Sequence, residues 1–324
     1  MKAWHVQDAE NIELKESTLE RKPGEVKLKI ARFAMSAGDV AFFSGDHKGD
    51  VTVPAHSAVG FVSEADEEFG MPLGTKVAIS PFITKDDDTI SCMGVDQDGF
   101  AQDFVCVPQD NVYQVPKDIP DEQLVFADYI AMADKAFGSI EYEKGDYVAI
   151  VGAGTLGLIL AQLALYYQTI PILIDFDMDR LQMATRWGIY YTINPTYDNV
   201  EKKVVELTGG RMCDFAFYAA SNIPFNTAMR LVKNEGEVIM SGYTNKSANQ
   251  VNLSIILKKQ LKVIGVSNGD GSFSTAINML ANHVVKTEGL VGRHYKFEEF
   301  DEMFKYIHEY PLQYNKVIID IQKL

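Results

Sequence analysis

The chain has 324 residues, of which 47% are hydrophobic and 23% charged, and its formal net charge is -15. A length above the roughly 250–300 residues at which single hydrophobic cores stop growing favours two domains, and the composition is that of a folded protein rather than a disordered one. The negative charge disfavours nucleic acid and anionic membrane surfaces as partners, because both are bound mainly through Lys and Arg.

The expected location follows from apolar runs and cysteines. No apolar run approaches the roughly 18 residues of a membrane span, and the first residues turn polar at once. The three cysteines, Cys92, Cys106 and Cys213, are odd in number and widely spaced. They form neither a disulfide framework nor a CxxC motif, so we expect buried, reduced thiols in a cytoplasmic protein.

The predicted elements change in kind along the chain. Up to about residue 120, short alternating runs such as 26–30 and 59–62 are punctuated by Gly and Pro, which predicts a β-rich domain. From Asp121, helical stretches alternate with apolar strands at Tyr147–Val151, 171–174, Cys213–Tyr218, 237–240 and 261–266, which is typical of βαβ units with a parallel sheet. The tail combines a helical run at 300–307 with a strand at 316–321 and is compatible with either domain.

The clearest motif is a GxGxxG at the junction of a strand and a helix, formed by Gly152, Gly154 and Gly157. The first glycine permits a tight turn, the second lets the backbone approach a pyrophosphate, and the third allows the helix to pack closely on the strand. The helix N-terminus, with Thr155 and Leu156, is then free to bind phosphate. The motif predicts a Rossmann-type dinucleotide site, the alternative being an ordinary glycine turn.

An acid after the next strand helps to decide which dinucleotide is bound. The strand at 171–174 ends at Asp175, about 20 residues beyond the glycines, where an acid binds the ribose 2′-hydroxyl. An acid there repels the 2′-phosphate of NADP, so NAD(H) is the predicted cofactor. Asp177 and Asp179 are near enough to compete for this role, and solvated acids without a ligand are the structural alternative.

With these motifs in place, the whole chain resembles the medium-chain dehydrogenase/reductase superfamily of zinc alcohol and polyol dehydrogenases and zinc-free quinone reductases. Residues 54–62 resemble the family's Pro-Gly-His-Glu-x-x-Gly-x-Val segment, and residues 98–102 resemble its DGxFAE strand. The resemblance implies an α/β fold. A GroES-like, β-rich catalytic domain at 1–120, completed by 275–324, would join a Rossmann NAD-binding domain with a doubly wound parallel sheet at 121–274.

Further cofactor contacts are implied by the resemblance alone. Arg180 stands five residues beyond Asp175, as in NAD-using members. Lys316 falls where the family often places a basic residue on the pyrophosphate. The loops 219–221 and 241–243 match loops that contact the cofactor in the family, which implies roles for Ala220 and Ser241.

The resemblance also implies where a catalytic zinc would be held, and this chain departs from the family there. The ligand positions carry Ser36, His56 and Asp128, and the Glu beside the His has become Ser57. A serine hydroxyl is a poor, neutral zinc ligand compared with a thiolate, so we expect no tightly bound catalytic zinc. The family's structural zinc requires four cysteines, and the matching stretch offers only Cys92.

Asp39 and His56 both remain, and in the zinc enzymes an acid at the position of Asp39 orients the ligand histidine. His56 is then either a general acid that protonates a carbonyl oxygen as hydride arrives, with Asp39 tuning it, or a weak metal ligand together with Asp128. A structural His56 satisfied by hydrogen bonds is the third reading. Ser36 completes the catalytic candidates, and Tyr129 is an alternative proton donor.

The predicted function is an NAD(H)-dependent oxidoreductase that moves a hydride between the nicotinamide and a small alcohol/carbonyl substrate without the family's catalytic zinc. A zinc-dependent alcohol or polyol dehydrogenase with an altered ligand set, and a non-catalytic NAD(H)-binding sensor or scaffold, are the alternatives. The resemblance implies a homodimer or homotetramer, for which the apolar segment 251–257 offers contacts. The substrate itself is not predicted, because specificity lies in the shape of a site rather than in a motif.

Overall fold

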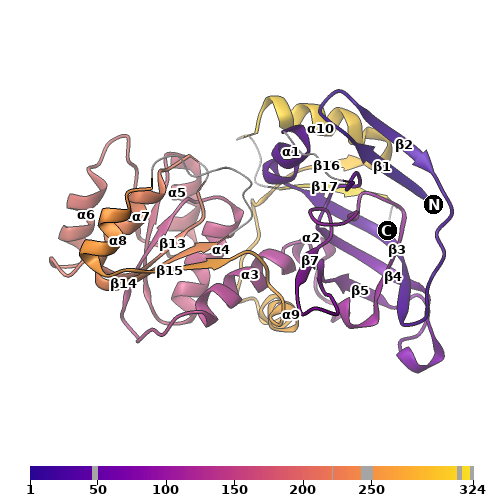
Figure 1. Ribbon diagram of the computed structural model, residues 1–324, viewed down its shortest axis with the longest axis horizontal. Helices are drawn as coiled ribbons and strands as arrows, with labels where there is room; N and C mark the ends of the chain where they lie inside the picture. Colours follow the sequence, from indigo (N-terminus) through magenta and orange to yellow (C-terminus); the bar gives the residue numbers. More distant parts are fainter. Residues whose placement is uncertain (46–49, 221, 242–250, 312–315, 322–324) are drawn as a thin grey trace. The chain divides into compact units, whose positions relative to one another are not determined.

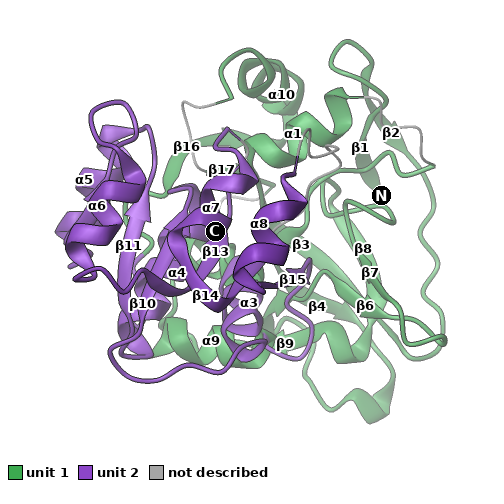
Figure 2. Ribbon diagram, turned by 60° about the vertical axis from the view of Figure 1, so that its left-hand side comes forward, with its two compact units in different colours: residues 1–128, 273–282, 287–324 green, residues 129–272, 283–286 purple. Residues whose placement is uncertain are grey.

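The computed structural model describes residues 1–45, 50–220, 222–241, 251–311 and 316–321, and it divides into two compact units. Unit 1 comprises Met1–Asp128, Phe273–Asn282 and Thr287–Leu324, and unit 2 comprises Tyr129–Ser272 and His283–Lys286 (Figure 2). The first boundary lies a few residues beyond the one expected at 120 and 121. No helix in the described part of the chain combines the length and the apolar character that crossing a membrane requires.

Unit 1 is built mainly of strands (Figure 1). They are β1 (Lys2–Val6), β2 (Ile12–Glu16), β3 (Glu25–Met35), β4 (Ser57–Glu64), β5 (Lys76–Ile79), β6 (Phe82–Thr84), β7 (Ile90–Cys92), β8 (Phe104–Pro108), β9 (Val112–Gln114), β16 (Val291–Lys296) and β17 (Lys316–Asp320). Its helices are α1 (Ala37–Ser44), α2 (Asp121–Leu124), α9 (Phe273–Ala281) and α10 (Phe300–Glu309), with short 3-10 turns η1 (Glu67–Phe69), η2 (Gln109–Asn111) and η3 (Phe297–Glu299).

A seven-stranded sheet forms the centre of unit 1. Its order is β16-β17-β3-β4-β5-β9, and β8 pairs with β3 as well. All of these pairs are antiparallel except β16 with β17. The hairpins β1–β2 and β6–β7 form two further sheets.

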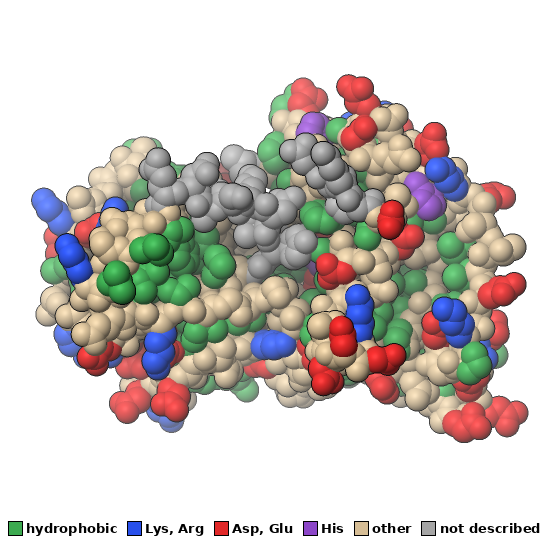
Figure 3. All heavy atoms as spheres, in the orientation of Figure 1, with side chains coloured by type: hydrophobic (Ala, Val, Ile, Leu, Met, Phe, Trp, Pro, Cys, Tyr) green, Lys and Arg blue, Asp and Glu red, His purple; other side chains and the backbone are tan. Residues whose placement is uncertain are grey.

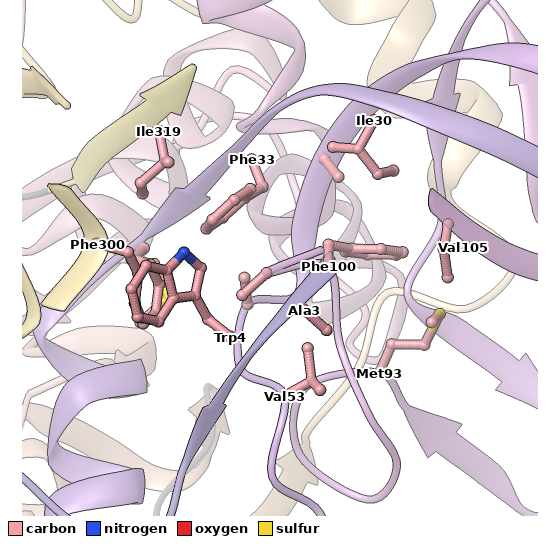
Figure 4. Packing of buried hydrophobic residues seen from close by; sticks show 14 of the residues in the cluster. Ala3, Trp4, Ile30, Phe33, Val53, Met93, Phe100, Val105, Phe300 and Ile319 are labelled. Carbon is pink, nitrogen blue, oxygen red and sulfur yellow. The ribbon is translucent and has the colours of Figure 1, made fainter. Parts of the chain in front are cut away.

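The core of unit 1 joins the first strand to the last helix. Trp4 of β1 stacks on Phe300 of α10 with ring centroids 5.3 Å apart (Figure 4). Its indole N–H donates to the Phe297 carbonyl oxygen at 2.8 Å. Phe33 of β3 packs edge-on against Phe297. Burial alternates along the first half of β3, as expected for a strand with one face on the core. The tail, which was compatible with either domain, therefore belongs to unit 1.

Unit 2 alternates strands and helices. The strands are β10 (Tyr147–Val151), β11 (Ile170–Ile174), β12 (Tyr191–Ile193), β13 (Cys213–Tyr218), β14 (Val232–Ser241) and β15 (Lys262–Val266). The helices are α3 (Ala127–Gly138), which starts in unit 1, α4 (Thr155–Tyr166), α5 (Met178–Arg186), α6 (Val200–Leu207), α7 (Phe225–Leu231) and α8 (Leu253–Lys259). All six strands are parallel, in the order β12-β11-β10-β13-β14-β15.

Helices cover both faces of this sheet. Successive side chains of a strand point to opposite faces, and Ala216 and Phe217 of β13 show the two environments. Ala216 packs in one buried cluster with Val204 of α6 and Met229 of α7. Phe217 packs against Phe137 of α3 with ring centroids 4.7 Å apart. The predicted doubly wound parallel sheet, preceded by a β-rich part of the chain, is therefore confirmed.

Candidate functional site

Three segments of unit 1 bring polar side chains to one end of its sheet. β3 lies between β4 and β17, because Ala34 pairs with Ser57 on one side and with Ile318 on the other. Ser36 directly follows β3, Ser57 begins β4 and Lys316 begins β17. The register of the sheet therefore gathers residues that are far apart in the sequence.

Asp39 lies in the first turn of α1, where the start of the helix holds its carboxylate. Its Oδ2 accepts hydrogen bonds from the Ser36 backbone N–H and the Ser36 hydroxyl, both at 2.7 Å, and its Oδ1 lies 2.6 Å from His56 Nδ1. Burial alone would raise the pKa of Asp39, but His56 and the Ser36 hydrogen bonds hold this pKa below its ordinary value. The ionised carboxylate is thus placed to orient the His56 ring.

The backbone before His56 adopts a conformation that favours glycine. Ala55 has a φ of 75°, where the family segment carries Gly. Two neighbouring glycines allow close packing here, since a Cβ on Gly94 or Gly99 would lie 2.6 Å or 2.1 Å from the Ala55 carbonyl oxygen. The Phe100 N–H donates to the same oxygen at 2.9 Å. The loop therefore fixes the direction in which the His56 side chain projects, at a strain of about 1 kcal/mol.

His56 bridges two carboxylates. Its Nδ1 faces Asp39, and its Nε2 lies 3.3 Å from Asp128 Oδ2. Burial alone would lower the pKa of His56, but Asp39 and then Asp128 raise it above its ordinary value. The His56 side chain is 17% exposed, against 2% for Asp39 and 4% for Asp128. Of the three groups, the imidazole is therefore the one that can exchange a proton with a small molecule.

Asp128 is also bound by Ser57 and Lys316. The Ser57 hydroxyl donates to Asp128 Oδ2 at 2.7 Å, and the Lys316 ammonium lies 3.5 Å from Oδ1. The same ammonium donates to Ser57 Oγ and to the Val125 carbonyl oxygen, both at 2.6 Å. Burial lowers the pKa of Lys316, and Asp128 and Asp39 oppose this shift. We refer to the six side chains as the polar cluster: Ser36, Asp39, His56, Ser57, Asp128 and Lys316.

The structure thus brings together all four residues that were predicted to be catalytic: Ser36, Asp39, His56 and Asp128. Their roles in catalysis stay predictions. Lys316, expected on the pyrophosphate, has its ammonium bonded to Ser57 and Val125 of unit 1, and its contact with the cofactor stays a prediction. Sequence reasoning missed Ser57 and Lys316 as members of the cluster. The available signal was the change from Glu to Ser beside His56, which removes a large anion and leaves room for another partner.

The residues at the family's zinc positions do not fit a zinc ion of the family's kind. Ser36 offers a neutral hydroxyl that already donates to Asp39, and Asp128 is paired with the Lys316 ammonium. Zinc sites in proteins use thiolate, imidazole or carboxylate ligands, so His56 is left without a free anionic partner for such a site. Burial, with Asp128 and two further acids, raises the pKa of the Cys92 thiol.

In unit 2, the predicted glycine motif forms the turn between β10 and α4. Gly152 has a φ of 104°, and a Cβ on it would lie 2.7 Å from the Ala219 carbonyl oxygen. A Cβ on Gly157 would lie 1.8 Å from the Gly152 carbonyl oxygen, whereas one on Gly154 would meet nothing within 4 Å. Gly154 is the N-cap residue of α4. Two of the glycines are therefore required by packing within unit 2, and the third leaves the backbone open to a ligand.

Asp175 lies against this turn at the end of β11. Its Oδ2 accepts the Ala153 N–H at 2.6 Å and its Oδ1 accepts the Asp177 N–H at 2.8 Å. Asp177 caps α5, accepting the N–H groups of Asp179 and Arg180, and Arg180 Nε lies 3.4 Å from Asp177 Oδ2. Of the acids offered by the sequence, Asp175 is thus fixed beside the glycines, and its oxygens keep lone pairs for a further hydrogen bond.

The two other loops predicted to contact the cofactor, 219–221 and 241–243, start at the carboxyl ends of β13 and β14, as the glycine turn does at the end of β10. Ala220 follows β13, and its Cα lies 2.9 Å from the position of a Cβ on Gly152. Ser241 ends β14; it is 6% exposed, and its hydroxyl has no hydrogen-bond partner among the described residues. The other residues of these loops, Ser221, Gly242 and Tyr243, lie outside the described residues. In open parallel sheets, ligands bind at the carboxyl ends of the strands, which is where these residues stand.

Comparison with known proteins places the chain among dehydrogenases. A family model described as alcohol dehydrogenase GroES-like domain matches residues 22–117, and one described as zinc-binding dehydrogenase matches residues 155–282, together more than half of the chain. An uncharacterized zinc-type alcohol dehydrogenase-like protein of Haemophilus influenzae is 26% identical over 98% of both chains. A sorbitol dehydrogenase of Halalkalibacterium halodurans is 24% identical over 88% of this chain and 89% of its own.

A solved structure has the same fold. An alcohol dehydrogenase of Escherichia coli, described as short chain and complexed with NADH, matches with a TM-score of 0.87 at 20% identity, covering 99% of each chain. The predicted combination of a GroES-like domain with a Rossmann domain is thereby confirmed. The chain belongs to the medium-chain dehydrogenase/reductase superfamily, in which it is an alcohol-dehydrogenase-like oxidoreductase.

Proposed function

We propose that this protein is an NAD(H)-dependent oxidoreductase that moves a hydride between the nicotinamide and a small alcohol/carbonyl substrate without a zinc ion of the family's kind. The observation that carries the proposal is the turn after β10, where packing requires Gly152 and Gly157 while Gly154 stays open. Such a turn in front of a helix N-terminus suits a pyrophosphate. The sorbitol dehydrogenase among the relatives supports a small alcohol as the substrate class.

The residues of unit 2 fit a nicotinamide dinucleotide. The open backbone at Gly154 and the start of α4, with Thr155 and Leu156, would take the pyrophosphate, and Asp175 would take a ribose hydroxyl. The buried Ser241 hydroxyl, which lacks a partner among the described residues, is a further donor for the cofactor. Bound NAD(H) supplies or accepts the hydride. Because Asp175 is fixed beside the turn, its charge would repel a 2′-phosphate, and we assign NAD(H) rather than NADP(H).

We assign proton transfer to His56. Asp39 holds Nδ1, so Nε2 carries the proton that is exchanged. When a carbonyl is reduced, the N–H bond at Nε2 breaks and its proton goes to the substrate oxygen; when an alcohol is oxidised, Nε2 takes the proton back. Asp39 stabilises the charged ring, and Ser36 positions Asp39. In this scheme Lys316 acts within the polar cluster rather than on the pyrophosphate, and Tyr129 is not needed as a donor.

One observation favours a second candidate, a zinc-dependent alcohol or polyol dehydrogenase with an altered ligand set. His56 Nε2 and Asp128 Oδ2 lie 3.3 Å apart. Two ligands of one tetrahedral zinc ion, each at about 2.1 Å, are separated by about 3.4 Å. Elemental analysis of protein purified without a metal-affinity tag decides between the candidates. About one zinc per chain, lost in His56→Ala, would favour the zinc enzyme.

The proposed function is tested by cofactor titration and a substrate screen. Wild-type protein should bind NADH more tightly than NADPH, and Asp175→Ala should reduce this preference about 10-fold or more. Asp179→Ala, on the exposed start of α5, is the matched control and should keep the preference. In a screen of carbonyls with NADH and of alcohols with NAD, His56→Gln should lower kcat about 10²- to 10⁴-fold and leave NADH affinity unchanged. Tight NADH binding without turnover of any carbonyl, quinone, enone or alcohol would instead indicate a sensor or scaffold.

Two further proposals concern assembly and location. β15 is an edge strand of the described six-stranded sheet, and Leu253 and Leu257 on the preceding α8 are 65% and 77% exposed. Figure 3 shows hydrophobic side chains gathered over this part of unit 2. An exposed edge beside an apolar patch suits a homodimer contact.

Leu257→Asp should yield monomers in sedimentation at micromolar concentration, and Leu73→Asp, at a 68% exposed leucine of unit 1, is the control. A monomeric wild type would refute the dimer. The cytoplasmic location stays a prediction.

A further inference from the structure

We infer that Lys316 is the resident cation of the polar cluster and takes the electrostatic place of a metal ion, because it neutralises Asp128 and so keeps a divalent cation from binding between Asp128 and His56. The inference rests on the proposed function, since it explains how the cluster can work without zinc. It also gives Lys316 a role different from the pyrophosphate contact that the family resemblance implies.

The Lys316 ammonium is built into the interior of unit 1. The residue is 0% exposed, and its ammonium has one acceptor for each of its three protons: Ser57 Oγ at 2.6 Å, the Val125 carbonyl oxygen at 2.6 Å and Asp128 Oδ1 at 3.5 Å. The ammonium also lies 5.3 Å from the centroid of the Phe126 ring, a distance typical of a cation–π contact. A buried charge with a full set of partners is a fixed part of a site.

The charges of the polar cluster balance only when Lys316 is included. Asp39 faces His56 at 2.6 Å, and Asp128 faces Lys316 at 3.5 Å and His56 at 3.3 Å. The two carboxylates are thus faced by the His56 ring and the Lys316 ammonium. A divalent ion between Asp128 and His56 would bring two further positive charges beside this ammonium, and the cluster has no third carboxylate to match them. Like charges at such distances repel strongly in a buried site.

Ser57 makes this arrangement possible. Its hydroxyl accepts from Lys316 and donates to Asp128, so it links the cation to the carboxylate. The corresponding family segment has Glu at this position. A Glu would pair with Lys316 directly and leave the Asp128 charge free for a metal. The Ser at position 57 therefore directs the Lys316 charge to Asp128.

The test measures zinc binding and does not depend on turnover. Wild type, Ser36→Cys, Lys316→Gln and the double variant Ser36→Cys/Lys316→Gln are dialysed to equilibrium against Zn²⁺, and bound zinc is measured by elemental analysis. Gln removes the charge but can still donate to the Val125 carbonyl. We expect no stoichiometric zinc on wild type, weak binding by Ser36→Cys, and about one zinc per chain in the double variant, bound at least 100-fold more tightly than in Ser36→Cys.

A matched control uses another lysine that satisfies backbone carbonyls. Lys259 of unit 2 donates to the carbonyl oxygens of Met229, Arg230 and Val232 and has no part in the polar cluster. Lys259→Gln, combined with Ser36→Cys, should leave zinc affinity at the level of Ser36→Cys alone. Adding His56→Ala to the double variant should abolish the zinc site, which assigns the bound metal to the cluster.

Two results would overturn the inference. Stoichiometric zinc on wild type that is lost in His56→Ala would show that Lys316 does not exclude a metal, and this measurement requires no Lys316 variant to fold. Equal zinc affinity of Ser36→Cys with and without Lys316→Gln would show that the ammonium is not the cause. The first result would also replace the zinc-free part of the proposed function, whereas the second would leave that function intact. Failure to bind NADH would overturn the proposed function alone.

Discussion

Replacing the glycines of the turn after β10 one at a time separates the packing of unit 2 from cofactor binding. A methyl group on Gly157 would lie 1.8 Å from the Gly152 carbonyl oxygen. Close carbon–oxygen contacts are about 3.3 Å, so α4 and the turn would have to move apart by more than about 1 Å. The atom that the methyl group would meet belongs to the backbone, so no flexible side chain can give way. We expect Gly157→Ala to lower the free energy of unfolding of unit 2 by about 3 kcal/mol or more.

Gly154→Ala should have the opposite effect. Its Cβ would meet no atom within 4 Å, and its φ of -68° suits alanine. The free energy of unfolding should stay the same or rise by about 0.5 kcal/mol, because alanine restricts the unfolded chain. The methyl group would stand where the backbone is open to the pyrophosphate. The Kd for NADH should therefore rise about 10- to 100-fold, or about 1.4–2.8 kcal/mol of binding free energy.

The two tryptophans make the assay specific to one unit. Trp187 lies in unit 2 and Trp4 in unit 1. In a Trp4→Phe background, urea unfolding followed by tryptophan fluorescence reports on unit 2, and NADH fluorescence reports binding. Unchanged NADH affinity in a folded Gly154→Ala protein would refute the reasoning that the cofactor approaches the open backbone there. Wild-type stability of Gly157→Ala would refute the close packing of α4 on the turn.

Three further predictions concern the polar cluster. Lys316→Met leaves Asp128 buried without its cation, so the free energy of unfolding of unit 1 should fall by about 3–5 kcal/mol, as measured through Trp4 fluorescence in a Trp187→Phe background. Adding Asp128→Asn to this variant should restore part of the lost stability. If the two substitutions instead destabilise unit 1 additively, Lys316 and Asp128 are not paired. The folded-state pKa of His56 is raised, so its stabilising effect is fully present below the ordinary pKa of 6.5 and is lost as the pH rises through the raised pKa. The stability difference between wild type and His56→Gln should therefore shrink as the pH rises above 6.5, and a growing difference would contradict the sign. Asp39→Asn should lower the pKa of His56 in a histidine NMR titration, because burial is then opposed only by Asp128, and an unchanged pKa would show that Asp39 does not hold the ring charge.

The fold of unit 2 could be predicted largely from the sequence, because its signals are local. The strands Tyr147–Val151 and Cys213–Tyr218 have the predicted bounds, and Gly157 meets its steric requirement within the turn itself, at the Gly152 carbonyl oxygen. Two strands depart from the prediction: β12 (Tyr191–Ile193) was not predicted, and β14 spans Val232–Ser241 where only 237–240 was predicted. The added residues 233–235 of β14 are exposed and polar. An apolar pattern detects the buried part of a strand and misses the part that faces solvent.

The polar cluster could be predicted only in part, because its assembly depends on strand register. Asp39 and His56 stood out through the family resemblance, and Asp128 and Ser36 through the zinc positions. The place of Lys316 depends on β17 pairing with β3 while β3 pairs with β4, which no local pattern specifies. For the φ of 75° at Ala55, the available sign was the Gly that the family segment carries at this position, since an alanine by itself gives no sign of a left-handed conformation.

The position of Lys316 also sets an order of events during synthesis. Lys316 and Ser57 are 259 residues apart in the sequence, so the acids and the histidine of the polar cluster are made long before its cation. Until β17 is added, the 32–35 end of β3 lacks its second neighbouring strand and Asp128 lacks its counter-charge. Most of unit 2, by contrast, is the continuous segment Tyr129–Ser272, which can fold as soon as it emerges. A chain released before residue 316 would therefore have a folded unit 2 and an incomplete unit 1, which proteases and chaperones can recognise.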